Sequence, residues 1–319
     1  NKGWEISVSG VPVKVKNFEW KTIFNWSKNN SMVESLPEGI DKIQIGSGVY
    51  NVKSYAEVGK PYGAIYAKTF KRDAEGYILC QLDGSPKEGQ DYEYLGCVQA
   101  DWRGGWNNVF RLGNFSFSVM FDFQKGGKFF SQTSIQSSVD GQSVKSLEGR
   151  DADFFSRKIL GESDEERYGF MRPQNANTPT ANGQIYPDWG RPKGVVLPNC
   201  RYDEDVEGLA GQQVLGYCTP ERYWMHYTSR DISRFIYDAS YVKLREITVS
   251  YDLPKKWLRK TPFQTFRVAA VGRNIATLFA NTPHGLDPQA TSTTGNAQGF
   301  ERGFNLPSAT YGFDIKVSF

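Results

Sequence analysis

The sequence predicts an all-β fold, an antiparallel segment of a transmembrane β-barrel with long loops at one end. Two patterns predict it: apolar and polar residues alternate in seven stretches, and short and long connections between these stretches alternate strictly. Aromatic residues make up 14% of the chain, which favours strands. No apolar run reaches the roughly 18 residues of a transmembrane helix. The net charge of +3 gives no indication of a nucleic-acid partner.

The first four strands are expected where the alternation is clearest. Even positions carry the apolar residues in the first three, at 4–9, 18–27 and 101–112, and odd positions carry them in the fourth, at 115–124. This change of parity predicts a two-residue turn at Gly113-Asn114, because such a turn places its flanking residues on one face. A connection of about seven residues is expected between the first two strands.

The last three strands are expected at about 237–252, 265–279 and 308–319. In the first of these, the apolar positions change from even to odd at Arg245-Glu246, which predicts a β-bulge that takes up one residue. The alternative is that this strand enters the apolar zone only at Ile247. The apolar face of the last strand consists of Tyr311, Phe313, Ile315, Val317 and Phe319.

The three long connections, at roughly 30–99, 131–236 and 280–307, would all lie at one end of the sheet. Outer-membrane barrels have this asymmetry. A soluble β-sandwich carbohydrate-binding module, the alternative, has no physical reason for it. A sheet in lipid must close, but the first and last of seven strands would run in the same direction. We therefore expect residues 1–319 to be the C-terminal part of one larger barrel domain.

Six motifs carry a resemblance to a known family. They are NKGWEISVSGVPVKVKNFEW (1–20), KPYGAIYAKTFKRDAEG (60–76), DWRGGWNNVFRLGNFSFSVMFDFQKGGKFFS (101–131), FIYDASYVKLREITVSYDLPKKWL (235–258), VGRNI (271–275) and ATYGFDIKVSF (309–319). With them the chain resembles the C-terminal barrel portion of SusC/RagA-type TonB-dependent outer-membrane transporters. The resemblance implies a plugged barrel of roughly 22 strands. The plug and the N-terminal strands would be absent from this chain.

The resemblance also implies partners and a location. The complete protein would lie in the outer membrane of a Gram-negative cell, contact TonB through the missing N-terminal part, and carry a SusD-like surface lipoprotein over its loops. It would import oligosaccharides or, less often, peptides. The last strand, which ends at Phe319, resembles the signal that the outer-membrane assembly machinery recognises.

No catalytic constellation is found, so we expect no enzyme; a surface glycoside hydrolase would need a paired acid and base. Sugar rings stack on aromatic side chains, so ligand contacts are expected in the longest loop. The candidates are Trp189, Arg191, Tyr202, Arg222, Tyr223, Trp224 and Tyr227. The alternative is that these residues pack the loop on itself or on the lid protein. The residues expected to face the lumen and the plug are Arg103, Asn107, Arg111, Asp122 and Gln124.

The cysteines lie as two local pairs, Cys80 with Cys97 and Cys200 with Cys218, which suggests two disulfides. The alternative is four buried thiols. No spacing indicates a zinc site. The acidic stretch YDEDVEG (202–208) resembles the start of a calcium loop, but Val214 stands where a bidentate Glu belongs. We expect no cofactor, and calcium in the extracellular loops is the alternative to a solvated acidic turn.

Overall fold

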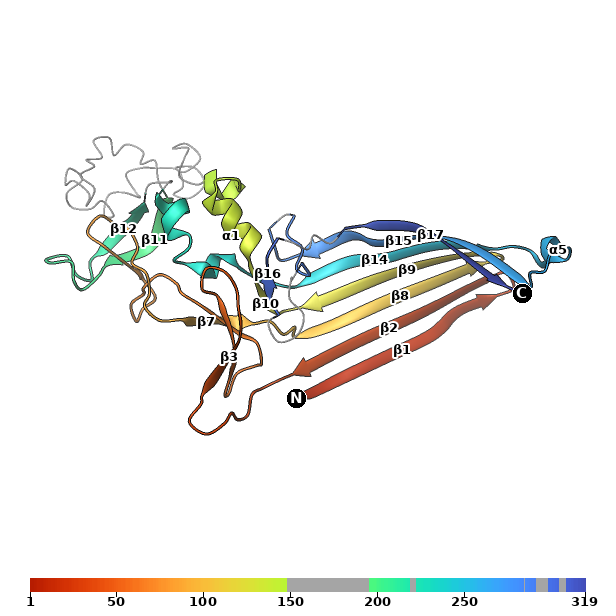
Figure 1. Ribbon diagram of the computed structural model, residues 1–319, viewed down its shortest axis with the longest axis horizontal. Helices are drawn as coiled ribbons and strands as arrows, with labels where there is room; N and C mark the ends of the chain where they lie inside the picture. Colours follow the sequence, from red (N-terminus) through yellow and green to blue (C-terminus); the bar gives the residue numbers. More distant parts are fainter. Residues whose placement is uncertain (148–194, 219–221, 284, 291–297, 304–307) are drawn as a thin grey trace.

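The computed structural model describes residues 1–147, 195–218, 222–283, 285–290, 298–303 and 308–319, and its main element is a seven-stranded antiparallel sheet (Figure 1). The strand order is β1-β2-β8-β9-β14-β15-β17. The strands are β1 (Lys2–Val15), β2 (Phe18–Asn30), β8 (Trp102–Leu112), β9 (Phe115–Lys125), β14 (Tyr241–Asp252), β15 (Thr265–Ala280) and β17 (Thr310–Ser318). These are the seven predicted strands, and β1 and β17 are the open edges of the sheet.

The pairing registers confirm two details of the alternation. Leu112 lies opposite Phe115, so Gly113-Asn114 is a two-residue turn. The register of β14 shifts between Leu244 and Glu246 against both of its neighbours, which is the predicted bulge.

The connection between the first two strands is shorter than predicted. β1 continues to Val15, so only two residues join it to β2. The register of β1 shifts between Gly10 and Val13, so that one additional residue stands on β1. This bulge moves the apolar positions from even to odd, and the second half of the strand therefore does not follow the parity of the first.

The sheet has one apolar and one polar face. The registers align Trp20, Phe110 and Phe117 across β2, β8 and β9, and their rings stack in succession at 5.9 and 6.1 Å. Many side chains on the apolar face are exposed, up to 91% for Phe313. A β-sandwich would need a second sheet over this face, and the described part of the chain leaves it open. An apolar surface this broad requires apolar surroundings.

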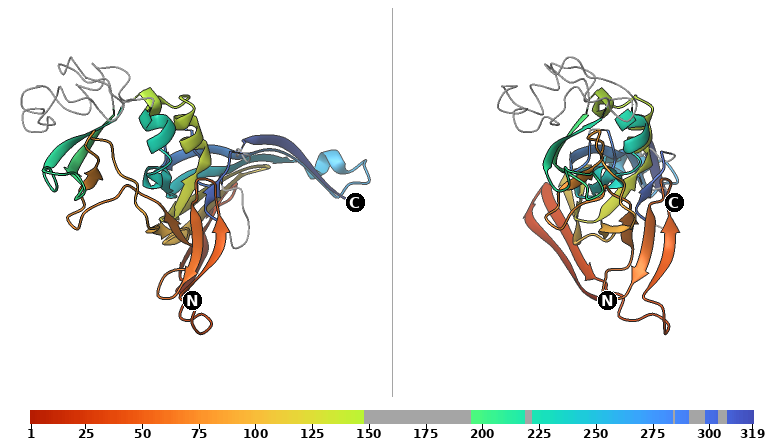
Figure 2. Two further views of the ribbon diagram at one scale, coloured as in Figure 1. Left: turned by 60° about the vertical axis from the view of Figure 1, so that its left-hand side comes forward. Right: turned by 90° about the vertical axis from the view of Figure 1, so that its left-hand side faces the viewer.

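The long connections build three smaller sheets beyond one end of the large sheet (Figures 1 and 2). The first contains β3 (Lys42–Ser47), β4 (Lys53–Glu57), β5 (Ala64–Ala67) and β7 (Glu93–Cys97); the second contains β6 (Ile78–Cys80), β11 (Val195–Tyr202) and β12 (Gln213–Cys218); the third contains β10 (Lys128–Ser131), β13 (Ile236–Asp238) and β16 (Phe300–Glu301). The helical segments of the described residues are α1 (Gln132–Val139), η1 (Val144–Leu147), η2 (Tyr223–Tyr227), η3 (Ile232–Phe235) and α5 (Lys255–Leu258). Among the described helices, none has the length and apolar character needed to cross a membrane.

The buried cores lie in these connections. One core brings together Ile65, Phe130 and Phe300, which come from the three different long connections. The buried Glu301 reinforces this junction, because its carboxylate accepts hydrogen bonds from Ser131 Oγ (2.6 Å) and Thr133 Oγ1 (2.6 Å) at the start of α1. The described parts of the three long connections are therefore packed on one another.

Candidate functional site on the polar face of the sheet

The five residues predicted to face a lumen share the polar face. Arg103 lies opposite Gln124, and its Nε donates a hydrogen bond to Gln124 Oε1 at 3.0 Å. Ser118 Oγ donates to Asn107 Oδ1 at 3.1 Å. Arg111 has the same parity as Arg103 on β8, and Asp122 has the same parity as Gln124 on β9, so all five point away from the apolar face. That this face lines a lumen stays a prediction, because the sheet is open.

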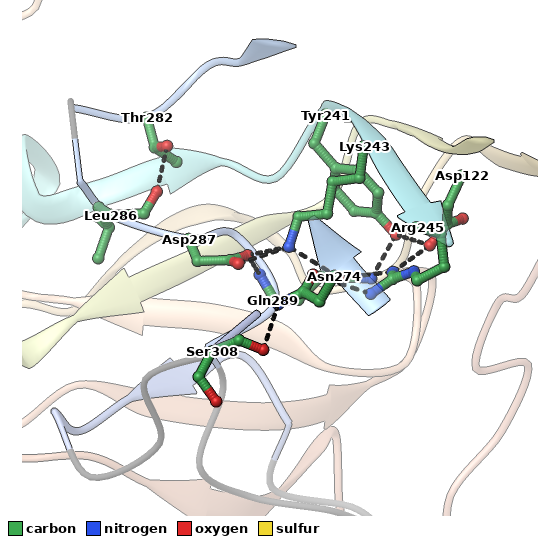
Figure 3. Close-up of polar contacts among 10 residues, drawn as sticks. All are labelled: Asp122, Tyr241, Lys243, Arg245, Asn274, Thr282, Leu286, Asp287, Gln289 and Ser308. Carbon is green, nitrogen blue, oxygen red and sulfur yellow. Dashed lines mark hydrogen bonds and ion pairs between the residues drawn. The ribbon is translucent and has the colours of Figure 1, made fainter. Parts of the chain in front are cut away.

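A buried lysine joins the third long connection to this face (Figure 3). Lys243 on β14 is fully buried. Its Nζ donates to both carboxylate oxygens of Asp287, at 2.6 and 2.5 Å, and to Gln289 Oε1 at 3.0 Å. A buried ammonium is tolerated only when it is paired and hydrogen-bonded. Asp287 and Gln289 therefore hold residues 285–290 against β14.

The same contacts extend to a second cation and a tyrosine. Arg245 donates to Asp122 and, at 2.7 Å, to Gln289 Oε1. The Tyr241 hydroxyl donates to Asp122 Oδ2 at 3.2 Å and accepts from Gln289 Nε2 at 2.5 Å. Gln289 is thus an acceptor for two cations and a donor to Tyr241. Among the groups of this network, only Asp122 was predicted from the sequence.

A cavity of about 420 Å³ opens where the polar face meets the long connections. Its lining includes Arg103, Asp122, Gln124, Lys128, Tyr241 and Gln289. A neighbouring hollow of about 520 Å³ shares Arg103 and Asp122 and continues over β1 and β2, with Ser7 and Asn25 in its wall. Guanidinium, amide, hydroxyl and carboxylate groups together can bind the hydroxyls of a sugar or the backbone of a peptide.

The residues predicted to contact ligand are placed differently. Trp189 and Arg191 lie outside the described residues. Arg222 forms an ion pair with Asp83 at 2.9 Å. The other four are buried in the core around β11 and β12, with exposures of 4% or less; they are Tyr202, Tyr223, Trp224 and Tyr227. Their burial favours the alternative that they pack the loop on itself.

The acidic turn after β11 is held by lysines. Asp203 is buried and accepts from Lys71 Nζ at 2.9 Å and from Lys87 Nζ at 2.7 Å, and Lys87 also contacts Asp205. Burial acts to raise the pKa of Asp203, but the hydrogen bonds from Lys87 and Lys71 outweigh it and lower the pKa to about 2. No group of three or more metal-ligating side chains occurs among the described residues. Calcium in these loops stays a prediction.

The structure contradicts both predicted disulfides. All four cysteines lie in the described part of the chain, and each is a thiol. Cys80 and Cys97 lie in different sheets, and Cys200 and Cys218 lie opposite Val214 and Val195, apart along the β11–β12 ladder. β6 pairs with β11 so that Cys80 lies opposite Tyr202 and Cys200 lies opposite Ile78, and Cys80 is therefore a neighbour of Cys200 rather than of Cys97. A hydrogen bond with the Cys200 side chain, together with burial, raises the pKa of the Cys80 thiol.

Comparison with known proteins identifies relatives, although no family model matches the chain. The chain is 23% identical over 333 residues to TonB-dependent receptor P3 of Formosa agariphila, covering 98% of this chain and 27% of that protein. It is 21% identical over 179 residues to TonB-dependent receptor P39 of the same organism, covering 41% and 17%. The chain thus spans less than a third of the length of these curated relatives.

Solved structures show the same fold. The RagAB peptide transporter matches 99% of this chain with a TM-score of 0.53 at 14% identity, and the chain covers 29% of that protein. The closed-closed state of the RagAB peptide importer matches with a TM-score of 0.55. These comparisons confirm the resemblance to SusC/RagA-type TonB-dependent transporters and the antiparallel barrel-type sheet. The relatives are named as receptors and transporters, not as enzymes.

Proposed function

We propose that this chain forms the C-terminal wall of a TonB-dependent importer in the outer membrane of a Gram-negative cell. The observation that carries the proposal is the sheet itself, with one apolar face, one polar face and all long connections at one end. The match to a TonB-dependent receptor over 98% of the chain supports it. The apolar face contacts lipid, and the polar face lines the lumen against a plug.

Residues 1–319 are, in this proposal, one part of a single barrel domain of roughly 22 strands. The open edges of β1 and β17 pair with strands outside these residues, because an unpaired strand edge in lipid leaves backbone groups without hydrogen bonds. TonB acts through the part of the protein that precedes residue 1. β17 closes the barrel, and its apolar residues up to Phe319 form the assembly signal.

The cargo is an oligosaccharide or a peptide. The polar lining of the two hollows, above all Arg103, Gln124 and Tyr241, supports a hydrogen-bonding cargo of this kind. A SusD-like surface lipoprotein covers the packed body of the long connections. The RagAB transporter, which has the same fold, is a peptide transporter, so peptide is the second cargo to test.

The test uses the complete protein in its own cells. We expect it in the outer-membrane fraction, with a surface lipoprotein as co-purifying partner. A strain that lacks the gene should fail to grow on the cargo as sole carbon source, and the parent gene should restore growth. Replacing Arg103 by Ala should slow growth. Arg111→Ala is the matched control, because Arg111 lies on the same face near the short turn and outside both hollows, and it should leave growth unchanged. Recovery of residues 1–319 as a soluble, monodisperse monomer would instead support the β-sandwich module.

A further inference from the structure

The connection between β14 and β15, residues 253–264, is strongly basic. It reads LPKKWLRKTPFQ and contains no acidic residue. Its four cations, Lys255, Lys256, Arg259 and Lys260, are all exposed. The connection contains α5 and lies at the end of the sheet opposite the long connections (Figure 1). It is therefore a surface feature that the proposed lumen and loops do not use.

The connection has a defined conformation that keeps these cations together. The backbone N–H of Trp257 donates to the carbonyl of Pro254 at 2.9 Å, and that of Thr261 donates to the carbonyl of Leu258 at 2.9 Å. The Leu258 side chain is buried. Gln264 N donates to the carbonyl of Ser318 at 2.8 Å, which ties the connection to β17. The four positive charges are thus presented from one ordered turn.

These cations also lack carboxylate partners. Two other cations near this end of the sheet are paired: Arg267 Nε lies 2.7 Å from Asp252, and Lys14 lies 3.3 Å from Glu19. Within the described residues, none of the four cations of the turn lies in an ion pair with a carboxylate. Four exposed like charges without partners repel each other, and an external anion relieves this repulsion.

A large exposed aromatic residue stands among them. The Trp257 side chain is 60% exposed, although tryptophan is mostly buried in proteins. The turn adjoins the apolar face of the sheet, where Phe263 and Phe319 pack edge to face at 5.3 Å and Leu112 is exposed. Tryptophan prefers the boundary between hydrocarbon and water, and lysine and arginine reach from there to lipid phosphates.

We propose that the turn 253–264 is a binding site for the phosphate groups of anionic phospholipids, with Trp257 inserted at the membrane boundary. The inference rests on the proposed function, because it requires the apolar face to lie in lipid. These phospholipids belong to the membrane leaflet at the short-turn end of the barrel. An acidic protein segment would satisfy the same cations, but it gives no reason for an exposed Trp257 next to a lipid-facing surface.

The experiment titrates the purified complete transporter with phosphatidylglycerol or with phosphatidylcholine and measures bound lipid by native mass spectrometry. K255Q/K256Q and R259Q/K260Q each remove two cations from the turn. K21Q/K316Q removes two exposed cations from the polar face and is the charge-matched control. Heat-modifiable migration on gels reports whether each variant folds.

Each turn variant should weaken phosphatidylglycerol binding by at least about fivefold, the effect expected from a single cation near an anionic membrane surface. Phosphatidylcholine binding by the turn variants should not change, and neither should phosphatidylglycerol binding by the control K21Q/K316Q. W257A should weaken binding of both lipids, because an interfacial anchor does not depend on head-group charge.

Three results would overturn the inference. They are equal phosphatidylglycerol affinity in parent and turn variants, an equal loss in the polar-face control, and loss of a co-purifying acidic protein with unchanged lipid binding. In each case a folded transporter in the outer membrane leaves the proposed function intact. Absence of the parent protein from the outer membrane would instead contradict the proposed function itself.

Discussion

Replacing Asp287 by Asn should detach the third long connection from the barrel wall. Asp287 provides both carboxylate oxygens to the fully buried Lys243. Removing one partner of a buried ion pair costs about 3 to 5 kcal/mol, because the remaining charge stays desolvated. Lys243 keeps a 3.0 Å hydrogen bond to Gln289, so we expect the lower end of this range.

Amide hydrogen exchange of residues 285–290 in the folded transporter measures this loss. About 3 kcal/mol corresponds to exchange that is roughly a hundredfold faster. The control is K243M/D287L, which removes both charges and should exchange within about tenfold of the parent, since apolar replacement of a buried pair is often neutral. Unchanged exchange in D287N, or equal acceleration in the double variant, would refute the role of the ion pair.

Three further predictions concern other parts of the chain. Phe319→Asp should lower the amount of assembled, heat-modifiable protein in the outer membrane, and unchanged amounts would contradict the proposed assembly signal. The depressed pKa of Asp203 stabilises the sheet of β6, β11 and β12 by about 2 kcal/mol above pH 4, and this contribution should be lost as the pH falls from about 4 to about 2. Asp203→Asn should remove this pH dependence of protease resistance, and an unaltered pH profile would argue against it. On the apolar face, Trp20 Nε1 donates to Asn108 Oδ1 at 3.0 Å, so Asn108→Ala should reduce the free energy of unfolding in urea by about 1 to 2 kcal/mol, and Asn108→Gln should lose less.

The large sheet could be predicted because its pattern depends on residues that are close in the sequence. Burial of one face imposes a period of two on each strand, and Leu112 and Phe115 show the turn between two strands directly. The bulge at Arg245-Glu246 was visible because the even apolar positions before it and the odd ones after it lie within one predicted strand. The bulge at Gly10–Val13 was missed because residues 11–17 were expected to form the connection, so the odd apolar positions Val13 and Val15 were not read as part of the strand.

The site was only partly predictable, because it depends on contacts between distant residues. The positions of Arg103 and Gln124 on the polar face follow from strand parity. Lys243 and Asp287 lie 44 residues apart, and nothing local connects them. Aromatic residues such as Trp224 in a long loop can either bind ligand or pack, and the pairing of β6 with β11 builds the core in which Trp224 is buried. The same pairing places Cys80 beside Cys200, which spacing along the chain does not indicate.

The central claim is that one face of the large sheet lies in lipid and the other in water, and spin labels along β9 test it most directly. Labels introduced one at a time at the positions of Phe117, Ser118, Val119 and Met120, in the complete protein in outer-membrane lipid, report contact with dissolved oxygen or with a water-soluble nickel complex. The account predicts strict alternation, with oxygen contact at 117 and 119 and nickel contact at 118 and 120. Nickel contact at all four positions, or contact with neither at 117 and 119, would contradict it.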